Sequence, residues 1–199
     1  MKKLLSLFLL LSCLLGPVSA EDGSRLWLRQ STDAHAQITV PRQSPTLNIA
    51  VRELKQAWKG LPVTLVLKKD KQLSSEGFRI RQVNGKLTVT SPSETGLLYA
   101  AYHLIRLQEM QNFGKPSETD QEITENPAYD LRILNHWDNL DRSIERGYAG
   151  KSLWNWEELP GTLSDRYEAY ARANASIGIN ATVLNLSLIH ISEPTRHLR

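Results

Sequence analysis

The sequence predicts an α/β protein: a small α+β domain at 21–128, followed by the truncated start of a (β/α)8 barrel at 129–185. Two observations predict this arrangement. Patterns for strand, helix, strand, β-hairpin and helix follow one another in 21–128, which favours a sheet with helices on one side. In 129–185, two apolar strands flank a long loop and a helix, and such a βαβ unit implies parallel strands. A complete barrel of eight such units needs roughly 250 residues.

The segment 1–20 predicts a signal peptide. Its three parts are a basic start, an apolar stretch at 4–15 and small residues that end in Ala20. We expect cleavage after Ala20 and export of the protein to the periplasm or the extracellular space. The only cysteine, Cys13, lies in this segment, so we expect no disulfides in the mature chain. Acylation of Cys13 is the alternative, although Leu11 is larger than a lipoprotein signal prefers.

The net charge of the central part of the chain argues against a nucleic-acid partner. The whole chain has 24 Lys and Arg residues against 21 Asp and Glu residues. Removing the terminal segments 1–20 and 186–199 takes away four basic residues and one acidic residue, which leaves 20 of each sign. A neutral chain provides no basic surface for nucleic acid, so we predict no such partner.

The first elements of 21–128 are short strands expected at 26–28 and 38–40. Ser44 and Pro45 then form an N-cap and a first helical residue, and apolar residues at helical spacing follow them. Gly60 ends this helix, and a strand at 63–67 comes next.

A hairpin and a second helix complete this domain. Asn84 and Gly85 predict a tight turn between strands at 78–83 and 86–90, and the helix starts near Ser93. The polar segment 111–126 predicts a linker on the surface. Because 21–128 has no metal-ligand spacing, phosphate loop or nucleophile elbow, we expect no metal and no cofactor.

The start of the predicted barrel carries the candidate site. A buried strand is expected at 131–134, Ser164 caps the next helix, Gly178 closes it, and 181–184 forms a second strand. In such barrels the sites are built at the carboxyl ends of strands. Amides and carboxylates hydrogen-bond hydroxyls, and indole rings stack on sugars. The predicted substrate-binding residues are Trp137, Asp138, Asn139, Trp154, Asn155, Trp156 and Glu157.

Each of these assignments has a structural alternative. On an extended segment Trp154 and Trp156 would face the same side and form a stacking wall, but they could equally pack the loop onto the barrel. The residues 137–139 could contact substrate or only position the loop. His136 could contact a hydroxyl or be a buried imidazole whose hydrogen bonds are satisfied within the protein.

Several motifs in this region resemble the glycoside hydrolase family 67 α-glucuronidases. They are Arg132-Ile-Leu-Asn-His-Trp-Asp-Asn139, Ser143-Ile-Glu-Arg-Gly-Tyr-Ala-Gly150 and Ser152-Leu-Trp-Asn-Trp156, and the likeness continues to Asn185. A weaker likeness at 96–106 is to a helix of the N-terminal domain found in β-hexosaminidase-type enzymes. The resemblance implies an N-terminal α/β domain that is hexosaminidase-like, a central (β/α)8 barrel and a C-terminal helical domain.

The resemblance also implies an activity. This is release of α-1,2-linked glucuronic acid, or its 4-O-methyl ether, from xylo-oligosaccharides with inversion, in xylan degradation. Inversion needs an acid and a base carboxylate roughly 6.5–9.5 Å apart, and the family takes them from later barrel strands. We therefore assign no catalytic residue and expect the 199-residue chain to be inactive. The implied partners are xylo-oligosaccharides bearing glucuronic acid, and the resemblance allows a homodimer of the full-length protein.

Two other functions are compatible with parts of the chain. One is a hexosaminidase-like glycosidase that shares only the N-terminal domain, and the motifs at 135–139 and 154–156 argue against it. The other is a non-catalytic carbohydrate-binding α/β domain. It would require 130–185 to form a closed unit, whereas one and a half barrel units leave strand edges open.

The last segment, 186–199, resembles the in-frame translation of a sequencing adapter, and we predict that it is not native. After Asn185 a barrel strand should pass into a polar loop, yet an apolar run continues without turn residues. A genuine extension of the second strand is the alternative. We expect no function for His190 or Glu193.

Overall fold

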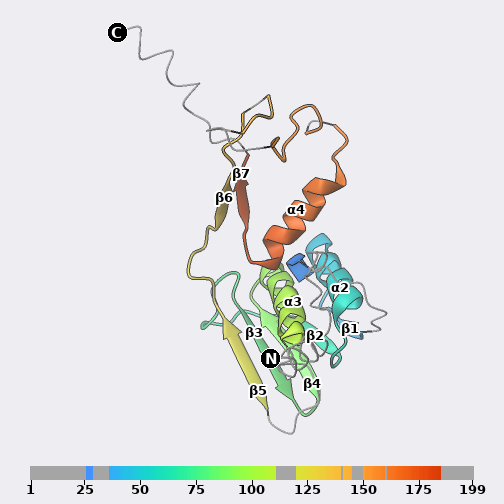
Figure 1. The fold of residues 1–199 in the computed structure, drawn as a ribbon. Helices are drawn as coiled ribbons and strands as arrows, with labels where there is room; N and C mark the ends of the chain where they lie inside the picture. The colour runs from blue at the N-terminus through green and yellow to red at the C-terminus, as the bar shows by residue number, and fades with distance from the viewer. Residues whose placement is uncertain are drawn as a thin grey trace, which may run out of the picture.

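The computed structural model describes residues 26–28, 36–110, 120–139, 141–144, 150–159 and 161–184. The predicted signal peptide and the predicted non-native tail lie outside these described residues. The described part of the chain forms a five-stranded sheet with two helices, from which a third helix and a two-stranded sheet extend (Figure 1).

The elements follow one another largely in the predicted order. They are η1 (Leu26–Leu28), β1 (Ile38–Thr39), α2 (Pro45–Ala57), β2 (Val63–Leu67), β3 (Phe78–Val83), β4 (Lys86–Ser91), α3 (Glu94–Glu109), β5 (Gln121–Glu125), β6 (Ile133–Asn135), α4 (Asp165–Ser176) and β7 (Ala181–Val183). The predicted strand at 26–28 is wrong. Trp27 and Leu28 have φ angles of 60° and 58°, which a strand does not allow, and η1 is a short 3-10 turn.

The larger sheet has the strand order β1-β2-β4-β3-β5. Its first three strands are parallel neighbours, and β3 runs antiparallel to both β4 and β5. The predicted hairpin turn is confirmed, with positive φ angles of 48° at Asn84 and 69° at Gly85. The predicted surface linker is wrong for β5, because backbone pairing with β3 makes this polar segment an edge strand whose Ile123 packs against the core.

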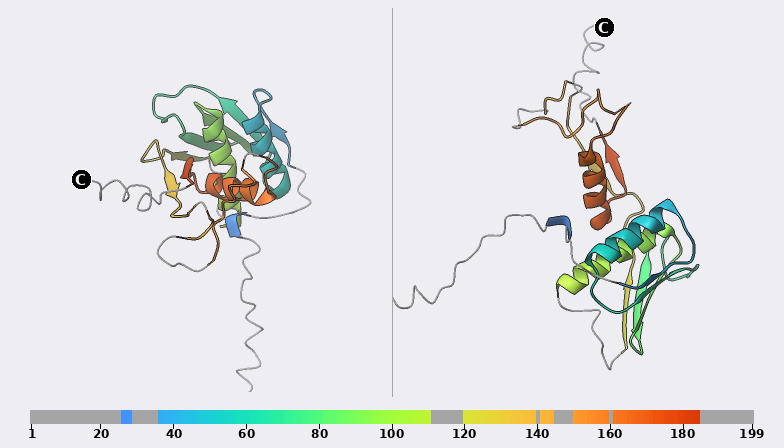
Figure 2. Two further views of the ribbon diagram at one scale, coloured as in Figure 1. Left: turned by 90° about the horizontal axis from the view of Figure 1, so that it is seen from above. Right: turned by 90° about the vertical axis from the view of Figure 1, so that its right-hand side faces the viewer.

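Helices α2 and α3 lie side by side on one face of this sheet (Figure 2). Their N-caps are the predicted ones: Ser44 Oγ accepts from the N–H of Leu47, and Ser93 Oγ accepts from the N–H of Gly96. The core between helices and sheet includes the fully buried side chains of Trp58, Leu65, Ile80, Leu97 and Leu104. The prediction of helices packed on one side of a sheet is therefore confirmed.

The smaller sheet contains the predicted parallel pair, with β6 beside β7 and α4 between them in the chain. The prediction of a buried strand at 131–134 is wrong in two respects. The strand is Ile133–Asn135, and Leu131 and Ile133 are 64% and 39% exposed. Among the described residues β6 pairs with β7 alone, and Leu134, like Ile133, stays exposed, at 37%. A (β/α)8 barrel, the hexosaminidase-like character of the first domain and the domain boundaries stay predictions.

Candidate functional site

The candidate site is formed where β6 and β7 end. The backbone N–H of His136 donates to the carbonyl of Val183 over 3.0 Å, which joins the carboxyl ends of the two strands. The residues 136–139, the loop 150–159 and the first turns of α4 meet at this end. The predicted site residues therefore share one region with α4, as strand-end sites do in βαβ folds.

Four rings form an aromatic cluster at its base: His136, Trp154, Tyr167 and Tyr170. The rings of Trp154 and Tyr167 stack with centroids 5.3 Å apart and an interplanar angle of 4°. His136 and Tyr170 meet Trp154 edge-on at 5.4 and 5.3 Å, and His136 Nε2 shares a 2.6 Å hydrogen bond with the Tyr170 hydroxyl. Trp154 is only 6% exposed, so in this structure its ring supports the loop and does not form an open wall.

Asp138 ties the first loop to the second. Its carboxylate is buried and accepts a 2.5 Å hydrogen bond from the Ser152 hydroxyl, whose oxygen in turn accepts from the N–H of Trp154. His136 Nδ1 lies 3.8 Å from the same carboxylate oxygen. Burial lowers the pKa of His136, and the charge of Asp138 opposes that shift. Asp138 therefore fixes the loop that carries Trp154.

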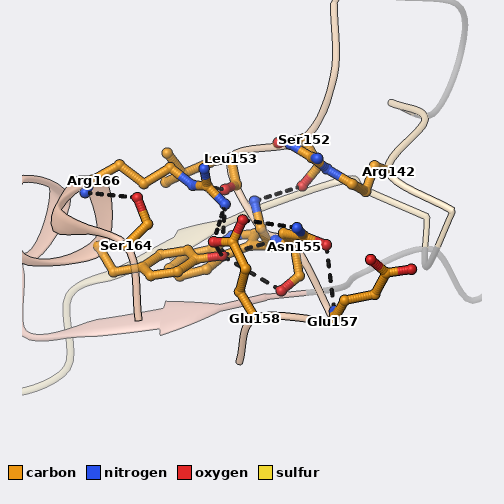
Figure 3. A network of polar contacts seen from close by, with 10 residues as sticks. Arg142, Ser152, Leu153, Asn155, Glu157, Glu158, Ser164 and Arg166 are labelled. Carbon is orange, nitrogen blue, oxygen red and sulfur yellow. Dashed lines mark hydrogen bonds and ion pairs between the residues drawn. The ribbon is translucent and has the colours of Figure 1, made fainter. Parts of the chain in front are cut away.

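A second polar network holds the turn that follows Trp154 (Figure 3). Arg166 of α4 forms a 2.5 Å ion pair with Glu158 and also donates to the carbonyl of Leu153 over 3.0 Å. Glu158 accepts from the Asn155 side chain at 2.8 Å, and the N–H of Asn155 donates to the hydroxyl of Tyr167. The hydrogen bonds from Arg166 and then Asn155 lower the pKa of Glu158, so this carboxylate stays charged.

The predicted site residues therefore fall into three groups by burial, and the half-buried group consists of Asn139, Asn155 and Trp156. Trp137 and Glu157 are exposed, whereas Asp138 and Trp154 are buried in the contacts given above. Asn139 donates from its side chain to the Ser143 hydroxyl over 2.9 Å. The segment 154–156 is not extended as the prediction assumed, because a turn begins at Trp156. The side chain of Trp156 is half-buried, so the two tryptophans differ in burial.

The sequence reasoning missed the residues that hold these two loops in place: Ser152, Glu158, Arg166, Tyr167 and Tyr170. Two of them had a detectable signature. Tyr167 and Tyr170 are three residues apart on a helix whose N-cap was predicted, so both rings lie on one face. Among the described residues no three His, Cys, Asp or Glu side chains could together hold a metal ion. Nor does the described part contain a helix of the length and apolar character that a membrane span needs.

Comparison with known proteins connects this geometry to a family. Residues 112–191 match the glycosyl hydrolase family 67 middle domain. Alpha-glucuronidase A of Aspergillus tubingensis is 31% identical over 214 residues, which cover 89% of this chain and 25% of that protein. The chain belongs to glycoside hydrolase family 67. Probable alpha-glucuronidase A of Aspergillus niger (strain ATCC MYA-4892 / CBS 513.88 / FGSC A1513) is 32% identical over 219 residues, covering 91% of the chain and 25% of the relative.

This family 67 chain spans about a quarter of the length of the curated relatives it matches. The middle-domain match contains every predicted substrate-binding residue. It also runs to residue 191, inside the segment that we predict to be non-native and that lies outside the described residues. Among solved structures, the "GH138 enzyme targeting pectin rhamnogalacturonan II" is similar with a TM-score of 0.53 and 18% identity, over 75% of this chain and 19% of that one. That likeness concerns the fold alone.

Proposed function

We propose that this chain is part of an exported α-glucuronidase that removes α-1,2-linked glucuronic acid, or its 4-O-methyl ether, from xylo-oligosaccharides with inversion. The observation that carries the proposal is the family 67 middle-domain match, which includes both loops of the candidate site. The names of the Aspergillus relatives, which are alpha-glucuronidases, support the α-glucuronidase part of the proposal. The polar and aromatic character of the strand ends suits a sugar, which offers hydroxyls and an apolar ring face.

Within this proposal the exposed residues bind the sugar and the buried ones position them. The ring of Trp137 is 38% exposed and stacks on a sugar ring, and Glu157, exposed on the second loop, accepts from hydroxyls. The side-chain amides of Asn139 and Asn155 donate to Ser143 and Glu158, so these two residues help to hold the loops in shape. The aromatic cluster and the Asp138–Ser152 hydrogen bond hold both loops still, which lowers the entropy lost when a ligand binds.

The same contacts argue against a catalytic role for two of the described loop carboxylates, Asp138 and Glu158. An inverting enzyme needs one carboxyl group that protonates the leaving oxygen and one carboxylate that activates water. Asp138 is buried on Ser152, and Glu158 is paired with Arg166. We therefore place the acid and the base in parts of the longer protein that this chain does not match, and we expect the 199-residue chain to release no glucuronic acid.

A binding titration tests the proposed site on this chain. Tryptophan fluorescence would be followed while aldotetraouronic acid is added, with xylotetraose as the comparison sugar. Trp137→Ala should remove most of the response, whereas Trp27→Ala, which replaces the 47% exposed tryptophan of η1, should leave it unchanged. Equal titration curves for the parent chain and Trp137→Ala would show that the sugar binds elsewhere.

A second experiment tests the activity itself. The coding DNA would be read across the codon for Asn185, and the extended product would be assayed on aldouronic acids by proton NMR. Release of β-glucuronic acid as the first anomer, together with no release by the 199-residue chain, is the expected result. Release of the α-anomer would contradict inversion, and release by the 199-residue chain would contradict its inactivity.

A stand-alone carbohydrate-binding role for the first domain finds little support in its surface. Sugar-binding platforms use several exposed aromatic rings, but in the described part of 21–128 the rings of Trp58, Phe78, Tyr99 and Tyr102 are all buried, and Trp27 of η1 is the one exposed Trp, Tyr or Phe ring. Binding of xylo-oligosaccharides by a protein of residues 21–128 alone would reverse this conclusion.

A further inference from the structure

Helix α4 connects the first domain to the candidate site through two opposite faces. At about 100° per residue, Tyr167 and Tyr170 lie on one side of the helix, while Glu168 and Arg172 lie on the other. The tyrosines belong to the aromatic cluster, whereas Glu168 and Arg172 contact α2. A shift of α4 relative to α2 would therefore move two rings of the site.

Arg172 is the main attachment on the domain side. Its Nε and Nη2 atoms lie 2.7–3.0 Å from the carboxylate oxygens of Glu53, a side chain of α2 that is only 2% exposed. Its Nη atoms also donate to the backbone carbonyls of Trp27 and Leu28, over 2.9 and 3.1 Å. The guanidinium lies 5.6 Å from the ring centroid of Tyr102. One planar fork thus joins α4 to η1, α2 and α3.

These contacts fix direction as well as distance. A guanidinium that donates to a carboxylate and two carbonyls can satisfy them only in one orientation. The carboxylate of Glu53 is too deeply buried for water to replace Arg172, so loss of this ion pair would leave an unpaired buried charge at a large cost in free energy. The other ion pair between the same helices, Arg52 with Glu168, is exposed on both sides and imposes little.

We propose that Arg172 is a positioning residue of the candidate site, which acts through α4 on Trp154 by way of Tyr167 and Tyr170. No atom of Arg172 belongs to the aromatic cluster, so its effect is transmitted by the helix. The inference concerns the geometry of the site, and it rests on the proposed function only for what that site binds.

Fluorine NMR of the 199-residue chain labelled with fluorotryptophan tests this role, since the chain has five tryptophans. Trp154→Phe assigns the Trp154 signal, and the buried Trp58 reports whether the first domain is folded. Arg172→Met should shift or broaden the Trp154 signal while that of Trp58 stays in place. Arg172→Lys keeps the positive charge but not the planar guanidinium, so its Trp154 signal should lie between those of the parent chain and Arg172→Met. Arg52→Met is the matched control and should change neither signal.

An unchanged Trp154 signal in Arg172→Met, with a native Trp58 signal, would overturn the proposal. If Arg172→Met also loses the Trp58 signal, Arg172→Lys and Glu53→Gln decide. A Trp154 shift in these milder variants supports the role, and its absence in both overturns it. Because no sugar is added, failure here is independent of whether the site binds glucuronic acid.

Discussion

Glu76 and Arg132 connect the first domain to the β6–β7 sheet, in addition to the contacts that α4 makes with that domain. Arg132 precedes β6 and pairs with Glu76 at 2.5 Å, and its guanidinium also donates to the carbonyls of Tyr129 and Gly178. Asn180, which precedes β7, donates to Glu76 as well, at 3.2 Å. The contact lies at the amino ends of both strands, opposite the end that carries the candidate site.

Arg132→Ala should loosen this end of the β6–β7 sheet. The loss of several charged hydrogen bonds from a mostly buried group is expected to lower the free energy of unfolding by about 1.5–3 kcal/mol. Hydrogen exchange should accelerate at 129–132 and 178–183 more than in α2. Arg81→Ala is the control, because its ion pair with Glu122 is exposed and should contribute less than about 1 kcal/mol. Equal effects of the two variants would contradict a structural role for Arg132.

The buried pair Glu53–Arg172 predicts a strongly non-additive result. Arg172→Met alone leaves the Glu53 charge buried and should cost about 3–5 kcal/mol, whereas Glu53→Leu combined with Arg172→Met should recover most of that loss. Urea unfolding of the single and double variants measures both quantities. Additive losses would mean that the two side chains do not depend on each other.

Gly96→Ala should destabilise the first domain. A Cβ at this position would lie 2.1 Å from Ser91 Oγ and 2.9 Å from the carbonyl oxygen of Gly77, where the first turn of α3 lies beside the end of β4 and the start of β3. Overpacking of this kind typically costs about 1–3 kcal/mol. Gly161→Ala is the control, because a Cβ there meets its nearest atom only at 3.9 Å. Thermal unfolding that shows no difference between these variants would contradict the close approach.

The sequence could predict the elements whose determinants are local. Ser44, Ser93 and Ser164 each cap a helix through their own side chain, and the turn at 84–85 needs only two residues with positive φ. It could not predict β5, since the polar segment becomes a strand only by pairing with β3. Nor could it predict the left-handed backbone of η1, whose carbonyls accept from Arg172, more than a hundred positions further along the chain.

In the candidate site, sequence reasoning found the strand end and the loops but not the way in which they are held. It treated Trp154 and Trp156 as equivalent, because residue spacing alone does not show that a turn begins at Trp156. The burial of Trp154 depends on Tyr167, which comes from the following helix and stacks on it. Contacts between a loop and a later helix are tertiary, and no pattern within the loop encodes them.

The half-buried histidines predict that the folded chain loses stability on mild acidification. Burial lowers the pKa of His103, with the charge of Arg106 adding to the shift, and burial also lowers the pKa of His136. The unfolded chain therefore binds more protons than the folded chain just below the ordinary histidine pKa of about 6.5. Stability is complete above that pKa and falls as the pH decreases through it toward the lower pKa values of the folded state.

Urea unfolding at pH 7.5 and pH 5.5 measures this loss. The carboxylates with lowered pKa values titrate below this pH range and do not contribute to the difference. The groups with lowered carboxyl pKa values, such as Asp70 and Glu158, lose their stabilising charge only below the ordinary carboxyl range, near pH 4. His103→Gln and His136→Gln should each reduce the difference in midpoint between the two pH values, because glutamine does not titrate. For His136→Gln, the change should be seen mainly in the fluorescence of Trp154, because the Trp154 ring contacts the His136 imidazole. A midpoint that rises on going to pH 5.5 would show that the histidines are stabilised in their charged form, contrary to the burial argument.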